Sequence, residues 1–347
     1  MSDDADLKDP FPAIEISSLF GDDRLAQAAT ITRIMVAARD SGFLVVTGLP
    51  DDCLSAVLRK RMLTIFSLSD AEKRRLCRQA VEPTHKNIYR GWFPLQQGQA
   101  SYKEGLDMGP DVAHGATRVD AGDPLTEATP LPDEDRLPGW RAAVATYYRG
   151  MEKTGAALMR AIARGLGLPA ESFAPAFEGG LSSLRLARYP VRTFESFGAD
   201  AESFRIVQGG QDWTLINVPH VDSGFVTLVA QDGIQGLQAE LEPGAWVTVP
   251  PQEGTVAVNF GMLLERWTGG AIKATRHRVI GRSEERYSVP FFYEPRVDAR
   301  IAPIPGVTPE DFAPFLYGDH LWAATTQFVE QAGIAHLRQP RGLSDSG

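Results

Sequence analysis

Residues 217–225 read Asn-Val-Pro-His-Val-Asp-Ser-Gly-Phe, and they decide how the rest of the chain is interpreted. The residues before His220 predict a strand, in which successive side chains point to opposite faces. His220 and Asp222 therefore present an imidazole and a carboxylate on the same side. Another histidine, His277, lies in the later segment Thr-Arg-His-Arg-Val at 275–279. If a second strand returns His277 to this place, two imidazoles and one carboxylate meet there.

This set of side chains predicts a metal site. Two histidines and one carboxylate bind one face of an ion and leave the opposite face open to small molecules. Nitrogen and oxygen ligands without thiolate suit Fe(II), and open positions suit reactions of O2. A His-x-Asp pair alone is common near strand ends, so the surrounding sequence has to support the assignment.

The chain of 347 residues has an ordinary globular composition, with 43% hydrophobic and 23% charged residues. This composition allows a sizeable core, and the length fits a single barrel unit with helical additions as well as two domains. The 35 Lys and Arg residues are outnumbered by 44 Asp and Glu residues, which gives a formal net charge of −9. Binding to a polyanion needs a basic face, so we expect no nucleic-acid partner.

The cysteine content and the N-terminus predict the compartment. Cys53 and Cys77 are the two cysteines of the chain, too few for a disulfide framework, and they lack Cys-x-x-Cys spacing. The first residues are acidic and contain no apolar signal core, and no apolar run approaches the length of a membrane span. We expect a cytoplasmic protein without a membrane partner. The sequence indicates no particular oligomeric state.

The first half of the chain carries helix and strand signals that predict a scaffold. Alternation of polar and apolar residues predicts a short strand at 13–16, and a continuous apolar run predicts a buried strand at 43–47. Helical spacing and capping residues predict helices that begin near Asp23, Asp52, Ser69 and Trp140. The last of these helices is long and extends to Leu166.

The pattern changes after residue 80 and again after residue 180. Residues 80–138 are rich in Gly, Pro and Asp and show little periodicity, which predicts a long functional loop. After residue 180, short apolar segments separated by turn residues predict antiparallel strands that close into a sandwich or barrel. Thr-Pro-Glu-Asp at 308–311 predicts the start of a helical segment that extends to Leu337. The predicted strands are 183–189, 214–218, 225–231, 237–239, 246–249, 256–260, 278–279 and 287–293.

The order of these residues resembles that of a known family, the isopenicillin N synthase-like group of non-haem Fe(II) and 2-oxoglutarate-dependent oxygenases. The motifs that carry the similarity are, in order, His220-x-Asp222, His277-Arg-Val and Arg286-x-Ser288. It covers roughly residues 11–295. Further segments that are similar to the family are 41–43, 91–95, 103–104, 231–238, 246–251, 258–261 and 264–270.

The resemblance implies an α+β fold with a double-stranded β-helix core, a jelly-roll or cupin-like barrel. Helices at the N-terminal side and one C-terminal helix would flank this core. We expect four segments within one compact unit. They are an N-terminal region with short strands, helices and a pocket-lining loop (1–138), a long supporting helix (139–180), the jelly-roll core (181–295) and a C-terminal helical segment (296–347).

The resemblance also implies roles for individual residues. The two histidines and the aspartate would hold Fe(II) and form the catalytic centre. Arg286 and Ser288, two apart on a strand, present a planar fork of donors and a hydroxyl on one face, which suits a carboxylate. In the family this pair holds the distal carboxylate of 2-oxoglutarate, and Tyr189 resembles a tyrosine that helps to bind it. The chain departs from the family at Ala187, where Asn is usual, and at Val221, where Thr or Ser is usual.

The implied activity is that of a dioxygenase. O2 and 2-oxoglutarate would be converted to succinate and CO2 while a small organic substrate is hydroxylated or desaturated. Two alternatives stay open. One is an Fe(II) oxidase of the same family that uses no 2-oxoglutarate and whose Arg-x-Ser pair binds a different carboxylate. The other is a barrel protein that binds a metal or small molecule without catalysis, although a structural metal site has no need of open positions.

Substrate contacts are predicted from nearness to the metal strand or from the loop resemblance. Two of the candidates are arginines, which motivates the hypothesis of a carboxylate-bearing substrate such as an amino acid or small peptide. The candidate residues are Arg90, Trp92, Phe93, Arg185, Asn217, Phe225 and Phe292.

Overall fold

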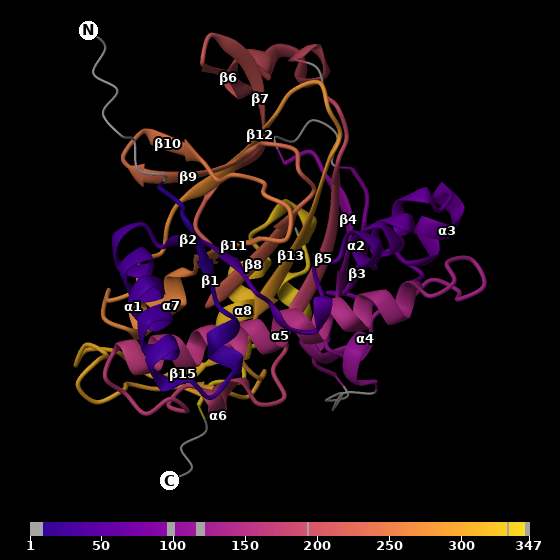
Figure 1. Cartoon of the computed structure of the whole chain (residues 1–347). Coiled ribbons are helices and arrows are strands. Elements are labelled where there is room, and N and C mark those ends of the chain that lie inside the picture. The colour runs from indigo at the N-terminus through magenta and orange to yellow at the C-terminus, as the bar shows by residue number, and fades with distance from the viewer. Residues whose placement is uncertain (1–9, 96–100, 116–121, 193, 332, 344–347) are drawn as a thin grey trace, which may run out of the picture.

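The computed structural model describes residues 10–95, 101–115, 122–192, 194–331 and 333–343. Two curled β-sheets form the centre of the molecule, and helices cover its outer side (Figure 1). The larger sheet has eight strands in the order β1-β2-β11-β8-β13-β5-β4-β3, and the smaller has five in the order β10-β9-β12-β7-β6, counted over the described residues. Strands that neighbour one another in space are mostly distant in sequence, as in a double-stranded β-helix.

The strands and helices have the following bounds. The larger sheet contains β1 (Ala13–Glu15), β2 (Phe43–Thr47), β3 (Gly91–Phe93), β4 (Glu104–Met108), β5 (Ser183–Tyr189), β8 (Val226–Gln231), β11 (Val256–Phe260) and β13 (Arg286–Tyr293). The smaller contains β6 (Arg205–Gln208), β7 (Gln211–His220), β9 (Leu237–Glu242), β10 (Ala245–Thr248) and β12 (His277–Gly281). A separate pair is β14 (Arg300–Ile301) with β15 (Phe315–Leu316). The α-helices are α1 (Arg24–Asp40), α2 (Ala56–Leu63), α3 (Asp70–Arg75), α4 (Asp111–His114), α5 (Trp140–Gly165), α6 (Ala174–Phe177), α7 (Met262–Trp267) and α8 (Tyr317–Thr325). Short 3-10 helices are η1 (Ser17–Phe20), η2 (Pro50–Asp52), η3 (Thr64–Ser67), η4 (Pro124–Thr126), η5 (Phe194–Phe204), η6 (Val329–Gln331) and η7 (Ala335–Leu337).

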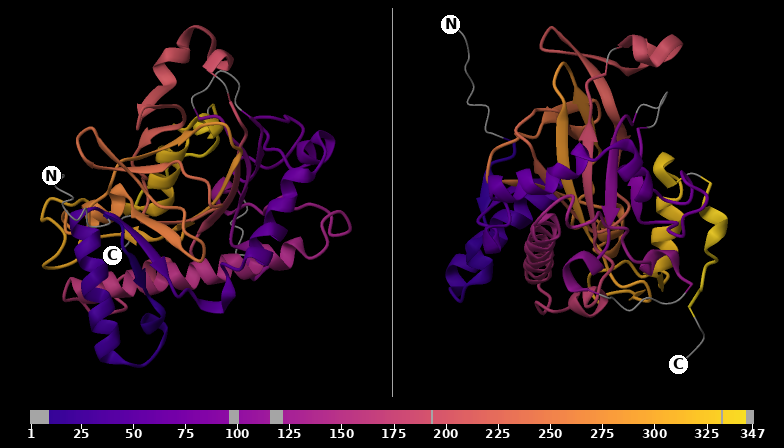
Figure 2. Two further views of the ribbon diagram at one scale, coloured as in Figure 1. Left: turned by 45° about the horizontal axis from the view of Figure 1, so that its top comes forward. Right: turned by 90° about the vertical axis from the view of Figure 1, so that its right-hand side faces the viewer.

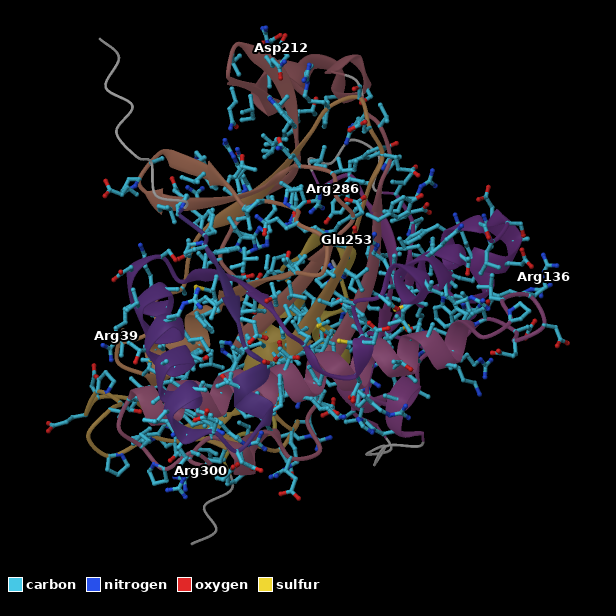
Figure 3. The ribbon with its side chains drawn as sticks, in the orientation of Figure 1. Arg39, Arg136, Asp212, Glu253, Arg286 and Arg300 are labelled. Atoms are coloured by element: carbon cyan, nitrogen blue, oxygen red, sulfur yellow. The ribbon has the colours of Figure 1, made fainter. Side chains whose placement is uncertain are left out.

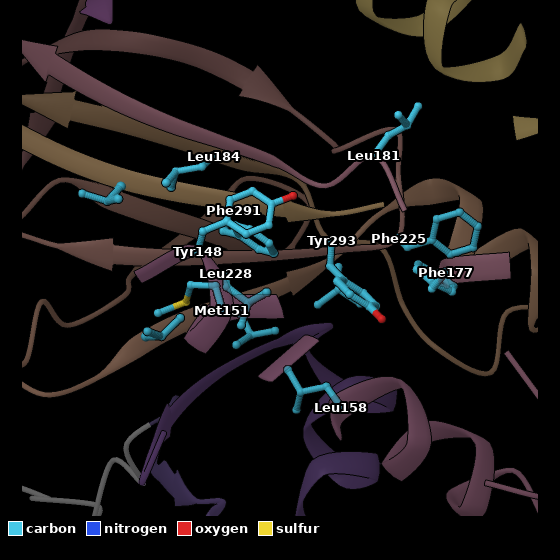
Figure 4. Packing of buried hydrophobic residues seen from close by; sticks show 14 of the residues in the cluster. Tyr148, Met151, Leu158, Phe177, Leu181, Leu184, Phe225, Leu228, Phe291 and Tyr293 are labelled. Carbon is cyan, nitrogen blue, oxygen red and sulfur yellow. The ribbon is translucent and has the colours of Figure 1, made fainter. Parts of the chain in front are cut away.

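The helix α5 supports the outer face of the larger sheet. It runs across the molecule beside the strands in the first view of Figure 2 and is seen nearly end-on in the second, and its apolar side packs on β8 and β13 (Figure 4). The ring of Tyr148 lies edge-on to Phe291 at 4.9 Å, and its hydroxyl donates to Ser182 O at 2.7 Å. Close approach is possible because Gly155 faces Tyr293, where a Cβ would lie 2.5 Å from the ring. The long helix is thus confirmed, and it fixes the strands whose inner faces build the site.

The predicted barrel is confirmed, and the N-terminal segment takes part in it. The strand β2 pairs with β11, and β1 extends this edge in parallel to β2. The division of the chain at 138/139, 180/181 and 295/296 stays a prediction. None of the helices in the described ranges combines the length and apolar character that a membrane crossing requires.

The loop predicted at 80–138 contains two strands, β3 and β4, so the prediction was wrong there. Every residue of β4 is buried, including Glu104 and Asp107, and the usual alternation of polar and apolar residues is absent. These carboxylates are tolerated because arginines of the neighbouring strand β5 pair with them, Arg188 at 2.9 Å and Arg185 at 2.6 Å. The sequence of β4 taken alone therefore resembles that of a polar loop, because the arginines that pair with its carboxylates lie on a different strand.

The C-terminal helix begins later than the pattern at 308–311 predicts. The helix α8 starts at Tyr317, after residues 315–316 have paired with β14. Pro314 explains the shift, because a proline disfavours the helical conformation of the residue before it and donates no backbone hydrogen bond. In the second view of Figure 2, α8 and α1 lie on opposite sides of the barrel.

A buried ion pair anchors the C-terminal segment, and its removal is expected to destabilise the fold. Arg338 Nε lies 3.0 Å from both carboxylate oxygens of Asp123, and neither side chain is appreciably exposed. We expect Asp123→Ala to lower the free energy of unfolding by about 1.5–3 kcal/mol or more, since it removes the charge-assisted hydrogen bonds to Nε of the buried Arg338 and leaves Asp319, 2.8 Å from Nη1, as its remaining carboxylate partner. The exposed pair Arg160–Glu171 offers a control, where Glu171→Ala should cost at most about 1 kcal/mol. Denaturant unfolding of both variants checks this, and equal small losses would contradict it.

Candidate metal centre and adjoining cavity

The three predicted metal ligands meet at one end of the smaller sheet. His220 is the last residue of β7, and it faces His277, the first residue of β12, across the antiparallel ladder. Oδ1 of Asp222 lies 3.6 Å from Nε2 of His220 and 3.7 Å from Nε2 of His277. One ligand atom of each residue lies within 4.8 Å of the other two. The arrangement can therefore hold a single metal ion with two nitrogen ligands and one oxygen ligand.

Backbone and side-chain hydrogen bonds orient these ligands. Nδ1 of His220 lies 2.8 Å from Val218 O, and Nδ1 of His277 lies 3.2 Å from Thr275 O. Because a carbonyl oxygen can only accept, each Nδ1 carries the proton and each Nε2 keeps its lone pair for a metal.

The carboxylate of Asp222 is oriented in the same way. Its Oδ2 accepts hydrogen bonds from Thr227 at 2.5 Å and from Asn259 at 2.7 Å, which leaves Oδ1 directed toward the two imidazoles. Thr227 lies on β8 and Asn259 on β11, so the larger sheet supports a ligand that belongs to the end of the smaller one.

The electrostatics of the site favour a bound cation. Burial, with a further contribution from His277, lowers the pKa of His220 to about 4. Burial acts to raise the pKa of Asp222, but the two imidazoles and the hydrogen bonds from Thr227 and Asn259 outweigh it and hold this pKa below its ordinary value. At neutral pH the imidazole of His220 is therefore neutral and the carboxylate ionised, as metal binding requires.

A buried guanidinium lies deeper in the barrel. Arg286 is 2% exposed, and Figure 3 places it among the strands, whereas Arg300 lies at the periphery. Its Nη2 donates to Gln231 Oε1 at 3.3 Å, while Nε and Nη1 have no hydrogen-bond partner in the described part of the chain. Tyr189 is its neighbour on β5, and Ser288 follows on the same face of β13. An uncompensated buried charge is costly, so this place fits an anion.

A cavity of about 340 Å³ adjoins the triad. It is lined by His220, Asp222, residues of β5, β8 and β13, and the C-terminal stretch 321–331. A larger surface hollow of about 1420 Å³ lies beside α5 and α6, but it contains neither the triad nor the arginine of β13. The smaller cavity touches the metal ligands and is therefore the candidate substrate site.

Three of the seven predicted substrate residues line this cavity, namely Arg185, Asn217 and Phe292. Nε and Nη2 of Arg185 form a two-point pair with Asp107, at 2.6 and 2.8 Å. The amide oxygen of Asn217 accepts from Ser101 Oγ at 2.9 Å. The aromatic ring of Phe292 supplies an apolar wall.

The other four predicted substrate residues do not line the cavity. Arg90 is buried and engaged by Asp111 at 3.3 Å and by backbone carbonyls of the loop that follows β4. Trp92 and Phe93 belong to the buried strand β3, and Phe225 packs among core aromatic rings. These four side chains pack within the loop and the core, and they do not lie at the cavity, where the sequence predicted them.

Several cavity residues were not predicted as substrate contacts. Glu330 and Gln331 come from the C-terminal segment, far from the metal strand, so no local pattern identifies them. Lys103 lies in the segment 103–104, whose sequence is similar to the family. Glu294 could have been found, because it lies two residues beyond Phe292 on the face that also carries Arg286. Burial, and to a smaller extent the charge of the metal-ligand carboxylate, raises the pKa of Glu294 to about 8.

Comparisons with known proteins agree with this geometry. A profile of the 2OG-Fe(II) oxygenase superfamily matches residues 190–295. The isopenicillin N synthase of Streptomyces clavuligerus is 32% identical over 89% of this chain and 93% of that protein. The chain belongs to the isopenicillin N synthase-like family of 2OG-Fe(II) oxygenases. It is therefore an oxidoreductase of the Fe(II)- and 2-oxoglutarate-dependent class.

Further similarities extend along most of this oxygenase. The proline hydroxylase buaE of Petromyces alliaceus is 31% identical over 65% of this chain and 69% of that protein. The crystal structure of a full-length Neurospora crassa protein in complex with alpha-KG superimposes with a TM-score of 0.75, at 25% identity, over 92% of this chain and 96% of that one. These similarities support the double-stranded β-helix and the family's cofactors, Fe(II) and 2-oxoglutarate.

Proposed function

We propose that this oxygenase is a dioxygenase that uses 2-oxoglutarate to hydroxylate or desaturate a small organic molecule. In hydroxylation one oxygen atom of O2 enters succinate and the other enters the substrate, with release of CO2. In desaturation the second oxygen atom leaves as water with two hydrogen atoms of the substrate. We assign His220, Asp222 and His277 as the Fe(II) ligands, and Arg286, Ser288 and Tyr189 as the residues that bind the cosubstrate.

The observation that carries this proposal is the uncompensated guanidinium of Arg286. Two of its nitrogens, Nε and Nη1, lack hydrogen-bond partners within the described residues, although the side chain is buried. A buried guanidinium with free donors matches a carboxylate, and the hydroxyl of Ser288 on the same face can add a further hydrogen bond. A dicarboxylate such as 2-oxoglutarate can place one carboxylate here and direct its keto acid end toward the triad.

The residues of the chain have separate tasks in this reaction. Fe(II), when bound, supplies the site at which O2 is activated. Thr227 and Asn259 keep the carboxylate of Asp222 in position, and the backbone carbonyls of Val218 and Thr275 do the same for the imidazoles. The cavity encloses the reacting part of the substrate and limits its exposure to water, which protects a reactive oxidant from side reactions.

The arginine-based hypothesis of a carboxylate-bearing substrate loses its support. Arg185 is already paired at two points with Asp107, and Arg90 is engaged within the loop away from the cavity. Neither guanidinium is free to receive a substrate carboxylate. The substrate's chemistry has to be inferred from other groups on the cavity wall.

The proposal is tested with the anaerobic protein. Addition of Fe(II) and then 2-oxoglutarate to the metal-free protein should produce the weak visible charge-transfer band of a chelated keto acid, and admission of O2 should release succinate. An acid of the same length without the keto group, glutarate, should give no band. Fe(II) binding without a band would favour the family's oxidases that use no 2-oxoglutarate, with Arg286 turned toward a carboxylate of the substrate.

A further inference from the structure

The ionisable groups on the wall of the cavity are paired with one another, with one exception. Lys103 Nζ lies 2.8 Å from Glu330 Oε1, and Arg185 is held by Asp107. The carboxylate of Asp222 belongs to the candidate metal site and accepts hydrogen bonds from Thr227 and Asn259. The positive charges that face the substrate are therefore already neutralised by carboxylates of the protein.

The exception is Glu294. This residue is 6% exposed, lines the cavity, and makes no ion pair with any residue that the structure describes. Its Oε2 has no hydrogen-bond partner there either. Its Oε1 approaches Gly224 so closely that a Cβ at that glycine would lie 2.7 Å away, which places the carboxyl beside the chain segment of Asp222. A buried carboxyl group without a partner is costly unless a ligand supplies one.

A second acceptor without a partner lines the same cavity. Nε2 of Gln331 donates to the backbone oxygen of Tyr89 at 3.2 Å. Because that oxygen can only accept, the orientation of the amide is determined, and Oε1 is the free atom. This Oε1 is buried and has no hydrogen-bond partner in the described ranges. Gln331 belongs to the C-terminal segment and Glu294 follows β13, so the two acceptors come from different parts of the chain.

We propose that Glu294, assisted by Gln331, is the recognition site for a protonated amino group of the substrate. The inference rests on the proposed function, because it places this group in the cavity that adjoins the iron ligands. An ammonium group offers three donors and a positive charge, which match a carboxylate and an amide oxygen. A carboxylate ligand would meet only cations that are already paired with carboxylates of the protein.

The proposal is tested by binding of matched probes to the protein loaded with Fe(II) and 2-oxoglutarate under argon. Benzylamine and cyclohexylmethylamine are each compared with the alcohol and the carboxylate of the same carbon skeleton by isothermal titration calorimetry. We expect each amine to bind at least tenfold more tightly than its alcohol, since a charge-assisted hydrogen bond is replaced by a neutral one. The carboxylates should bind more weakly still.

Variants assign the preference to specific residues. Glu294→Gln is nearly isosteric and should lower the affinity for the amines roughly 10- to 100-fold while leaving the alcohols within about threefold. Gln331→Leu should produce a smaller loss in the same direction. Glu253→Gln, the same exchange at an exposed carboxylate, serves as the control and should change nothing. The keto acid band of each variant, measured without amine, must match that of the parent, which separates an altered cavity from a damaged metal site.

Two outcomes would overturn the assignment. In one, neither amine binds the parent protein more tightly than its alcohol. In the other, the preference persists undiminished in Glu294→Gln. If the parent forms no keto acid band, the proposed cosubstrate is wrong, but the same titrations on the Fe(II)-loaded protein still decide whether Glu294 selects an amine.

Discussion

Replacement of His277 by alanine is expected to lower the affinity for Fe(II) by more than about 100-fold and to abolish turnover. The change removes one of three protein ligands, and loss of a group that merely supports a ligand already costs roughly 10- to 100-fold in metal sites generally. The effect should be on the metal rather than on the fold, because the site lies at a strand end and the remaining ligands keep their own hydrogen bonds. Fe(II) titration of the metal-free protein under argon measures the affinity.

His114→Ala provides a matched control for this variant. The imidazole of His114 is exposed and lies 2.9 Å from Glu152, away from the cavity beside the triad. We expect the control to bind Fe(II) like the parent. If His277→Ala retained the parental affinity, the assignment of the triad would be wrong, since two ligands cannot hold the ion as three do.

Replacement of Arg286 by leucine is expected to weaken 2-oxoglutarate binding by roughly 100-fold or more. Two charge-assisted hydrogen bonds are lost, each contributing about 1.5–3 kcal/mol, and every 1.4 kcal/mol corresponds to about tenfold in affinity. Fe(II) binding should be unchanged, because Arg286 belongs to β13 and contributes no ligand. The measurement is the concentration of 2-oxoglutarate that gives half of the keto acid band.

Two further variants sharpen this experiment. Arg286→Lys keeps the charge but not the planar fork, so we expect an intermediate loss. Arg300→Leu, the same exchange at an exposed position, should leave the cosubstrate affinity at the parental value (Figure 3). A parental affinity in Arg286→Leu would mean that the cosubstrate is bound elsewhere, and Arg286 would then be tested with carboxylates of candidate substrates.

The metal ligands and the strand pattern could be predicted from the sequence because both depend on local periodicity. The alternation of side chains in a strand places Arg286 with Ser288, and both lie within β13. The same spacing suggested His220 with Asp222, although β7 ends at His220 and Asp222 follows the strand. The long helix could be predicted for the same reason, since its buried positions recur at helical spacing from Trp140 onward. The strand over residues 183–189 was predicted with the bounds that the structure gives it.

The substrate side of the site could not be predicted in this way. The sequence offers Arg90 and Arg185 as free cations, but their carboxylate partners are supplied by Asp111 and Asp107, which only the fold brings within reach. Conversely, the carboxyl group of Glu294 has no distinguishing sequence pattern apart from its place two residues after Phe292.

The amino-acid sequence by itself determined the two short motifs, most of the barrel strands and, through the resemblance, the family. The tertiary structure alone decided which charged groups are paired and which remain available in the cavity. The physical reason is that backbone hydrogen bonds can join strands of almost any sequence. Long-range packing therefore decides that His277 lies opposite His220 and that Gln331 lines the cavity. Whether a charged side chain has an ion-pair partner depends on which residues this packing brings together, and the spacing of residues along the chain does not contain that information.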